Sequence, residues 1–205
     1  MERLERFLET VEKSADSQHH QSEIFMRVNK ENTSHFIKMF KIVTQIDFKD
    51  KNILDVGFGV GDALTVFKSE GANPVGICVN DSEIDFIKTK GHEAYKMDQS
   101  FMSFEDNHFD VVWSRHCLEH SIMPFYTLHE YKRVMKPGAF LYVEVPAPET
   151  IYHHEDNKEH FSLFSMDVWL ILMKRVFTVV SNVASNMVGK DGSKDVFYSF
   201  ILKKV

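Results

Sequence analysis

Hydrophobic and polar positions along the chain form short apolar runs separated by segments with helical spacing. The apolar runs predict strands over 52–56, 75–79, 93–97, 109–113 and 139–145. Helical spacing between them predicts helices over 62–69 and 83–89 and a mostly helical segment over 121–135, broken near Pro124. Short continuous apolar runs are typical of strands that are buried on both faces of a parallel sheet. The pattern therefore predicts five alternating β/α units.

The last third of the chain departs from this alternation. A polar, histidine-rich loop is expected from Pro146 to about His160, and an apolar helix follows over 165–175. Two further strands are predicted over 177–184 and 196–203. The glycine-rich stretch 189–193 between these strands has the composition of a hairpin connection. The chain is therefore expected to end in an antiparallel hairpin.

Helical patterns also precede the first strand. We expect an amphipathic helix over 1–13, a polar loop over 14–22, and helical segments over 23–29 and 34–44. No linker of low complexity and no internal repeat divides the chain. The sequence therefore predicts a single domain over 1–205, with a helical segment over 1–50 in front of a core over 51–205.

Composition narrows the class of protein without naming a function. The 205 residues are 43% hydrophobic and 26% charged, which is ordinary for a soluble globular protein. A formal net charge of −6 argues against nucleic-acid binding by bulk charge. No leader and no membrane-spanning segment is expected from the sequence. The two cysteines, Cys78 and Cys117, are expected to be reduced thiols of a cytoplasmic protein. Nothing in the sequence indicates an oligomeric state.

The glycine-rich loop after the first strand is the strongest chemical signal. Asp55 stands two residues before Gly57, and Gly59 and Gly61 follow at alternate positions before Asp62 opens a helix. A strand, a glycine loop and a helix in this order receive a nucleotide-like ligand at the end of a strand. The spacing is not that of the dinucleotide fingerprint, and carboxylates beside the loop would repel a phosphate. The loop therefore favours a cationic or zwitterionic ligand.

The pattern D-V-G-x-G-x-G over 55–61 resembles the first motif of class I S-adenosylmethionine-dependent methyltransferases. The stretch 104–112 is similar to the F-x-D-x-x-F-D-V-V approach to the fourth strand of that family, and Leu118-Glu119-His120 resembles the L-E-H sequence of its small-molecule group. The resemblance implies a Rossmann-like fold with a seven-stranded sheet, helices on both faces and a C-terminal antiparallel hairpin. It also implies an N-terminal helical cap over 1–50 and S-adenosylmethionine as the cofactor.

The resemblance assigns the cofactor contacts residue by residue. Asp55, Gly57 and Gly59 would hold the methionine part, with Phe58 in the same loop. The family usually closes its second strand with an acid that holds the ribose, but Cys78 stands there in this chain. Cysteine is a poor acceptor, so Asn80 is expected to take the ribose contact, with Asp81 or the backbone as alternatives.

The end of the third strand would meet the adenine. Met97 is expected to pack on the base and Asp98 to accept from its exocyclic amine, with Gln99 beside them. Ser114, at the end of the fourth strand, completes the expected cofactor set. The alternative for Asp98 is that it caps the following turn.

Three histidines are the candidate catalytic residues. His116 and His120 would share a face of a helix, and His160 lies in the H-F-S step that faces the substrate pocket in related methyltransferases. A neutral imidazole can take the proton of a substrate hydroxyl. The alternatives are a metal pair completed by Glu119, for which H-x-x-x-H is a weak signal, and purely structural roles. A base is preferred, and no metal is expected.

These observations predict transfer of a methyl group from S-adenosylmethionine to a small molecule, with a hydroxyl oxygen as the preferred acceptor. A nicotinamide-dependent oxidoreductase is the rival enzyme class, and the glycine spacing and the terminal hairpin count against it. The second rival is a non-catalytic interaction module that retains the fold. Cys78, in place of the usual ribose-binding acid, is the best support for that rival.

Overall fold

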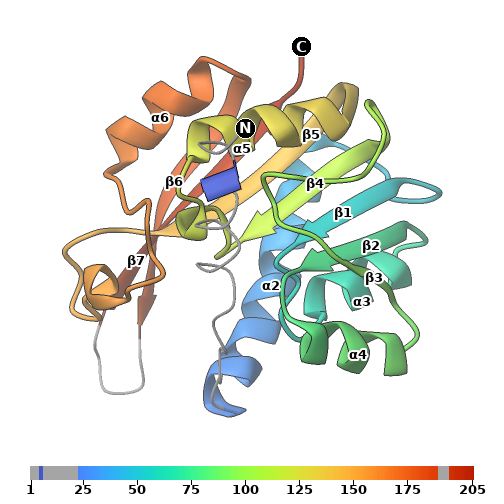
Figure 1. Ribbon diagram of the computed structural model, residues 1–205, viewed down its shortest axis with the longest axis horizontal. Helices are drawn as coiled ribbons and strands as arrows, with labels where there is room; N and C mark the ends of the chain where they lie inside the picture. The colour runs from blue at the N-terminus through green and yellow to red at the C-terminus, as the bar shows by residue number, and fades with distance from the viewer. Residues whose placement is uncertain (1–4, 7–22, 189–193) are drawn as a thin grey trace.

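A seven-stranded mixed sheet is the centre of the computed structural model, which describes residues 5–6, 23–188 and 194–205 (Figure 1). The strands are β1 (Asn52–Val56), β2 (Asn73–Cys78), β3 (Glu93–Lys96), β4 (Phe109–Arg115), β5 (Met135–Pro146), β6 (Thr178–Val188) and β7 (Lys194–Lys203). The helices are α2 (Glu23–Thr44), α3 (Asp62–Ser69), α4 (Asp81–Thr89), α5 (Pro124–Val134) and α6 (Met166–Lys174), with short 3-10 turns η1 (Leu118–His120) and η2 (His154–Asp156).

The order of the strands explains where a ligand can bind. The order is β3-β2-β1-β4-β5-β7-β6, in which β1 pairs in parallel with both β2 and β4. The chain therefore runs outward from β1 in one direction and from β4 in the other. Such a switch point leaves a crevice at the carboxyl ends of the two strands. Asp55 lies opposite Trp113 in this register, so the glycine loop and the end of β4 meet at one edge.

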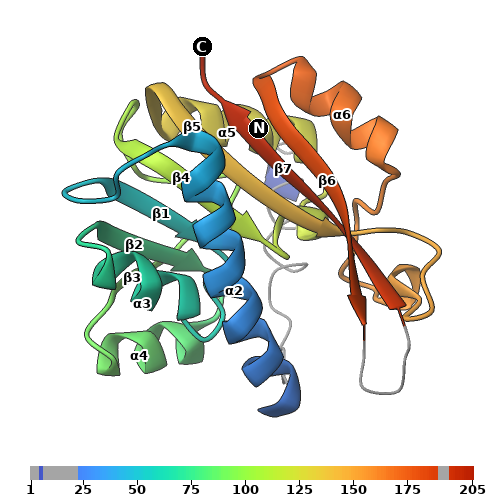
Figure 2. The same ribbon diagram turned by 180° about the vertical axis from the view of Figure 1, so that it is seen from behind.

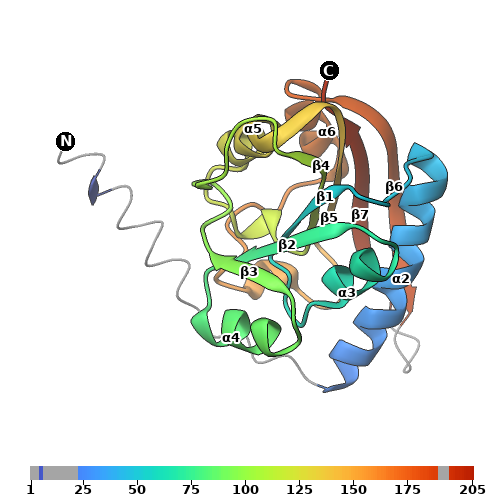
Figure 3. The same ribbon diagram turned by 90° about the vertical axis from the view of Figure 1, so that its right-hand side faces the viewer.

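Helices cover both faces of the sheet, as Figures 2 and 3 show. On the face with α2, α3 and α4, an aromatic cluster forms around Phe40, Phe67 and Trp113, which are fully buried. On the face with α5 and α6, the larger cluster includes Tyr131 and Trp169, also fully buried. The predicted fold class is thus confirmed, including the antiparallel pairing of β7 with β5 and β6.

Some predicted boundaries were wrong, for local reasons. The segments expected over 23–29 and 34–44 form the single helix α2, because no glycine or proline separates them. Regular helix α5 begins only at Pro124, which occupies its first turn, and Leu118–His120 forms a separate 3-10 turn. Strand β5 begins at Met135 because that residue pairs with Phe109 before a register shift.

Apart from Glu5 and Arg6, the helix expected over 1–13 lies outside the described residues, as does the connection at 189–193. Among the helices that the structure describes, none is long and apolar enough to cross a membrane.

Candidate functional site

The glycine loop between β1 and α3 depends on backbone conformations that favour glycine. Gly57 has a φ of +70° and its N–H donates to the carbonyl of Ile77 at 2.8 Å. A Cβ added at Gly57 would lie 2.7 Å from Cys117 Sγ, so the loop passes very close to the segment after β4. A Cβ added at Gly59 would meet nothing within 4 Å, so this side of the loop has room for a ligand.

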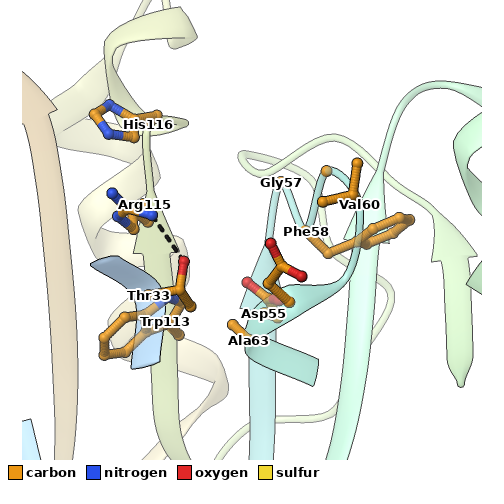
Figure 4. Close-up of a pocket in the computed structure, with 11 residues that line it drawn as sticks. Thr33, Asp55, Gly57, Phe58, Val60, Ala63, Trp113, Arg115 and His116 are labelled. Atoms are coloured by element: carbon orange, nitrogen blue, oxygen red, sulfur yellow. Dashed lines mark hydrogen bonds between the residues drawn. The ribbon is translucent and has the colours of Figure 1, made fainter. Parts of the chain in front are cut away.

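A pocket opens between this loop and the end of β4 (Figure 4). Asp55 and the loop lie on one wall, and Arg115 and His116 lie on the other. The lining residues are Thr33, Asp55, Gly57, Phe58, Gly59, Val60, Asp62, Ala63, Trp113, Arg115 and His116. Four of the expected cofactor residues, Asp55, Gly57, Phe58 and Gly59, and one expected catalytic histidine therefore border the same cavity.

Asp55 is an acid in an unusual environment. Its side chain is 3% exposed, and among the residues that the structure describes its Oδ2 has no hydrogen-bond partner. Burial raises the pKa of Asp55 to about 7, even though the charge of Arg115 acts to lower it and that of Asp62 adds to the rise. A buried carboxylate of this kind is stabilised by a cationic ligand that enters the pocket.

Arg115 supplies the positive charge across the pocket. Its Nε donates to Glu144 Oε1 at 2.6 Å and its Nη1 to Thr33 Oγ1 at 2.8 Å. The guanidinium also lies over the ring of Phe36, 5.2 Å from the ring centroid. Helix α2 and strand β5 therefore hold the guanidinium in one orientation. The sequence analysis missed this residue, although it stands at the end of β4, next to His116.

Glu144 connects Arg115 to His116. His116 Nε2 lies 3.0 Å from Glu144 Oε1, and Tyr142 and Ser199 donate to Oε2 at 2.8 and 3.2 Å. Burial alone would raise the pKa of Glu144, but the hydrogen bond from His116 and the charge of Arg115 lower it to about 2. The ionised carboxylate therefore accepts the Nε2–H of His116.

His116 is held as a neutral, oriented imidazole. Burial lowers its pKa, against the opposing effect of Glu144. Its backbone has a φ of +53°, and its N–H donates to the carbonyl of Glu144 at 2.9 Å. Because Nε2 carries the proton, Nδ1 carries the lone pair. Nδ1 lies 3.9 Å from Glu119 Oε1. The ring can therefore accept a proton beside the pocket.

Cys78 and Asn80, at the end of β2, both make contacts within the protein. Cys78 lies in an apolar cluster with Phe58 and Ile84, its Sγ donates to the carbonyl of Asn80 at 3.4 Å, and burial raises its pKa to about 12. The helix expected over 83–89 begins two residues earlier, at Asp81, because Asn80 is the N-cap residue of α4. Its Oδ1 accepts from Ser82 N at 2.9 Å. A ribose contact of Asn80 remains a prediction, and would use the amide nitrogen.

This dual role of Asn80 is testable. Asn80→Ala should lower the free energy of unfolding by about 1 kcal/mol because it removes the helix cap. Asn80→Asp should retain the cap, but it lacks the amide nitrogen. Urea unfolding of both variants checks the first effect, and calorimetric affinity for S-adenosylmethionine checks the second. Unchanged affinity in both variants would contradict the ribose contact.

The other expected cofactor residues mainly contact the protein. Gln99 is buried, its Nε2 donates to the carbonyl of Cys117 at 2.9 Å and its Oε1 accepts from Tyr131 at 2.6 Å. The same tyrosine hydroxyl lies 3.2 Å from Ser114 Oγ. These contacts fasten the loop after β3 to the end of β4. None of these residues lines the described pocket.

Asp98 and Met97 precede this network. Asp98 Oδ1 accepts from the N–H of Ser100 at 2.7 Å, which is the turn-capping alternative raised from the sequence. Burial raises the pKa of Asp98. Met97 is partly buried and packs against the larger core cluster. Their contacts with adenine stay a prediction.

His120 and His160 lie together, apart from His116. Their ring centroids are 5.0 Å apart, and each ring directs Nδ1 at a backbone carbonyl. Glu119 lies beside them and is 1% exposed. Burial raises the pKa of Glu119 to about 8. The sequence suggested that His116 and His120 share a face of a helix. In the structure His120 lies against His160 instead.

Comparisons with known proteins agree with this geometry. A family model described as a methyltransferase domain matches residues 54–143, which include the glycine loop, Arg115 and Glu119. A sterol 24-C-methyltransferase from Yarrowia lipolytica is 33% identical over 119 residues, which cover 53% of this chain and 30% of that protein. The chain therefore spans less than half of the curated relative that it matches.

Solved structures share the fold at low sequence identity. A SAM-dependent methyltransferase from Methanosarcina mazei has a TM-score of 0.64 and 20% identity, over 77% of this chain and 93% of that one. A SAM-dependent methyltransferase from Archaeoglobus fulgidus has a TM-score of 0.67 and 20% identity, over 87% and 94%. At these identities the likeness concerns the fold.

Proposed function

We propose that this chain, which belongs to the class I S-adenosylmethionine-dependent methyltransferases, transfers a methyl group from that cofactor to a hydroxyl oxygen of a small molecule. The observation that carries the proposal is that a carboxyl group and a guanidinium lie on the two opposite walls of the pocket at the switch point. Asp55 and Arg115 face a space that is bordered by the open side of Gly59. This arrangement fits a zwitterion better than a phosphate.

The methionine end of S-adenosylmethionine fits these residues. The buried Asp55 Oδ2 would accept from its ammonium group, and Arg115 would stabilise its carboxylate. The bound cofactor supplies a methyl group that is already activated by the positive sulfur. The residues of this chain then need to orient the acceptor, exclude water and remove a proton.

His116 is the residue we assign to the proton. Its Nδ1 would accept the hydroxyl proton as the oxygen attacks, and Glu144, which accepts from Nε2 at 3.0 Å, would stabilise the resulting imidazolium. Glu144 thus acts as a positioning residue. His120 and His160 remain on the acceptor side of the site, in the loops that follow β4 and β5.

The wider setting of the site is part of the proposal. We assign residues 1–50 to an N-terminal cap on a core of 51–205 in a single domain, because Thr33 of α2 lines the pocket and its hydroxyl accepts a hydrogen bond from Arg115. A net charge of −6 supports a small-molecule acceptor over a nucleic acid. The free thiols of Cys78 and Cys117 support a cytoplasmic location.

Methyl transfer itself is the test. The purified chain is incubated with S-adenosylmethionine that carries a labelled methyl group and with panels of small alcohols and phenols, amines and thiols. We expect label in one or more hydroxyl compounds. Label only in amines, thiols or carbon atoms would contradict the hydroxyl acceptor. Cofactor binding without transfer to any compound, in extracts as well as in the panels, would favour the non-catalytic module.

A further inference from the structure

We propose that Glu119, His120 and His160 form a binding site for one divalent first-row cation, such as Mn²⁺, Fe²⁺ or Zn²⁺, beside the methyl-transfer site. Each of the three side chains offers a ligand atom, and these atoms all lie within 4.8 Å of one another. The role of the cation rests on the function proposed above, whereas its binding is measurable without turnover.

Two loops that are distant in sequence bring the ligands together. Glu119 and His120 lie in η1, directly after β4, and His160 lies at the end of the loop that follows β5. The N–H of Ser162 donates to the carbonyl of Glu119 at 3.0 Å, and Ser162 Oγ donates to the carbonyl of Ser121 at 2.6 Å. Ser162 is 2% exposed, so these buried hydrogen bonds hold the two loops in a fixed relative position.

The histidine rings have the outer partners that metal ligands need. His120 Nδ1 lies 3.0 Å from the carbonyl of Glu159, and His160 Nδ1 lies 2.9 Å from the carbonyl of His154. A carbonyl only accepts, so Nδ1 carries the proton in both rings and Nε2 carries the lone pair. Ligating histidines typically donate their other ring nitrogen to a carbonyl or carboxylate in this way.

Glu119 adds a buried carboxyl group. Its side chain is 1% exposed, and among the residues that the structure describes Oε2 has no hydrogen-bond partner. The buried guanidinium of Arg115 pairs with Glu144. An ionised carboxylate is costly to bury at the position of Glu119, and a bound cation would offset that cost.

The ligand set limits the kind of ion. Two imidazoles and one carboxylate suit Mn²⁺, Fe²⁺, Co²⁺ and Zn²⁺ better than Ca²⁺ or Mg²⁺, which prefer oxygen ligands. Three protein ligands leave coordination positions for oxygen atoms of a substrate. The alternative raised from the motif H-x-x-x-H, a metal pair of His116 and His120, does not form, because His116 lines the pocket beside the glycine loop instead.

The position of the site gives the cation a role in the proposed reaction. Glu119 Oε1 lies 3.9 Å from His116 Nδ1, so the candidate base and the cation site are neighbours. A hydroxyl bound to the cation loses its proton more readily. The proton would pass to His116 Nδ1, the new bond would form between the oxygen and the methyl carbon, and the carbon–sulfur bond would break with its electron pair left on sulfur. No electron is transferred to or from the cation.

Binding of Mn²⁺ to the chelator-treated full chain, without a histidine tag, tests the site. Electron paramagnetic resonance of unbound Mn²⁺ gives the stoichiometry and the affinity. We expect about one ion per chain in the wild type, and affinity weakened about 10-fold or more in Glu119→Gln and in His120→Ala. His129→Ala, which removes an exposed histidine of α5, is the control and should bind as the wild type does.

Two results would overturn the proposal. One is the absence of Mn²⁺, Co²⁺ and Zn²⁺ binding by the wild type, and the other is unchanged affinity in His120→Ala, which removes a partly exposed side chain and should fold even if Glu119→Gln does not. Calorimetric binding of S-adenosylmethionine is measured on the same samples. If the wild type does not bind S-adenosylmethionine, the result counts against the proposed function. If it binds S-adenosylmethionine but no metal, the result counts against this site alone.

Discussion

Asp55→Asn is expected to weaken the binding of S-adenosylmethionine by about 100-fold, because it removes the one buried carboxylate that we assign to the ammonium group of the cofactor. Asparagine keeps the shape of the side chain and leaves an oxygen that accepts a neutral hydrogen bond. Isothermal calorimetry with S-adenosylhomocysteine, which keeps the ammonium group, should give the same loss. Asp85→Asn, which removes an exposed carboxylate of α4, should bind both ligands as the wild type does.

The same substitution should stabilise the free protein at high pH. The pKa of Asp55 is raised in the folded state from its ordinary 3.8 to about 7. Folding therefore favours the protonated acid. Its contribution to the free energy of unfolding is complete below pH 3.8 and is lost as the pH rises through about 7. Asparagine does not titrate, so at pH 8 the ligand-free variant should exceed the wild type in free energy of unfolding, by at most about 4 kcal/mol.

Thermal or urea unfolding at pH 4 and pH 8 checks this second effect. The difference between Asp55→Asn and the wild type should be small at pH 4 and large at pH 8, and saturating S-adenosylmethionine should reduce the difference at pH 8, because it binds the wild type more tightly. An equal difference at both pH values would mean that the Asp55 carboxylate is not destabilised by burial. Unchanged affinity in the variant would place the methionine end of the cofactor elsewhere.

His116→Asn should reduce the rate of methyl transfer by about 10²-fold or more, because it removes the group that takes the hydroxyl proton. Asparagine is the suitable replacement, since the backbone of His116 has a φ of +53° and asparagine tolerates this left-handed conformation. Affinity for S-adenosylmethionine should change little. The rate is measured with any hydroxyl acceptor that the wild type methylates.

His153→Asn is a matched control for that variant. His153 also has a positive φ, of +45°, and its side chain is 67% exposed in the loop after β5. It should therefore keep the wild-type rate. If His116→Asn also kept the wild-type rate, His116 would be a structural residue, and the proton would have to leave by another route.

Much of the fold was predictable because its signals are local. Continuous apolar runs identify the parallel strands, and Asp55 with the three alternate glycines identifies the ligand-binding turn at β1. Even the cap at Asn80 has a local cause, since its side chain bonds to backbone two and three residues ahead. The split of α2 into two segments was wrong, because the polar residues at 30–33 include no glycine or proline and do not end a helix.

Other parts of the site depend on contacts between distant segments. Arg115 is fixed by Thr33, 82 positions earlier, and by Glu144, 29 positions later. The approach of His160 to Glu119 likewise depends on how the loop after β5 folds back onto η1. Such contacts leave no periodic trace in one sequence. The charged wall of the pocket and the candidate cation site therefore emerged only from the structure.

The central claim is that the pocket between Asp55 and Arg115 receives the methionine end of S-adenosylmethionine. Calorimetric titration of the wild-type chain with S-adenosylmethionine, S-adenosylhomocysteine and NAD(P)H tests it most directly. The account predicts binding of both sulfur ligands with a dissociation constant in the micromolar range, and no binding of the nicotinamide cofactors. Binding of NAD(P)H, or no binding of either sulfur ligand, would contradict the account.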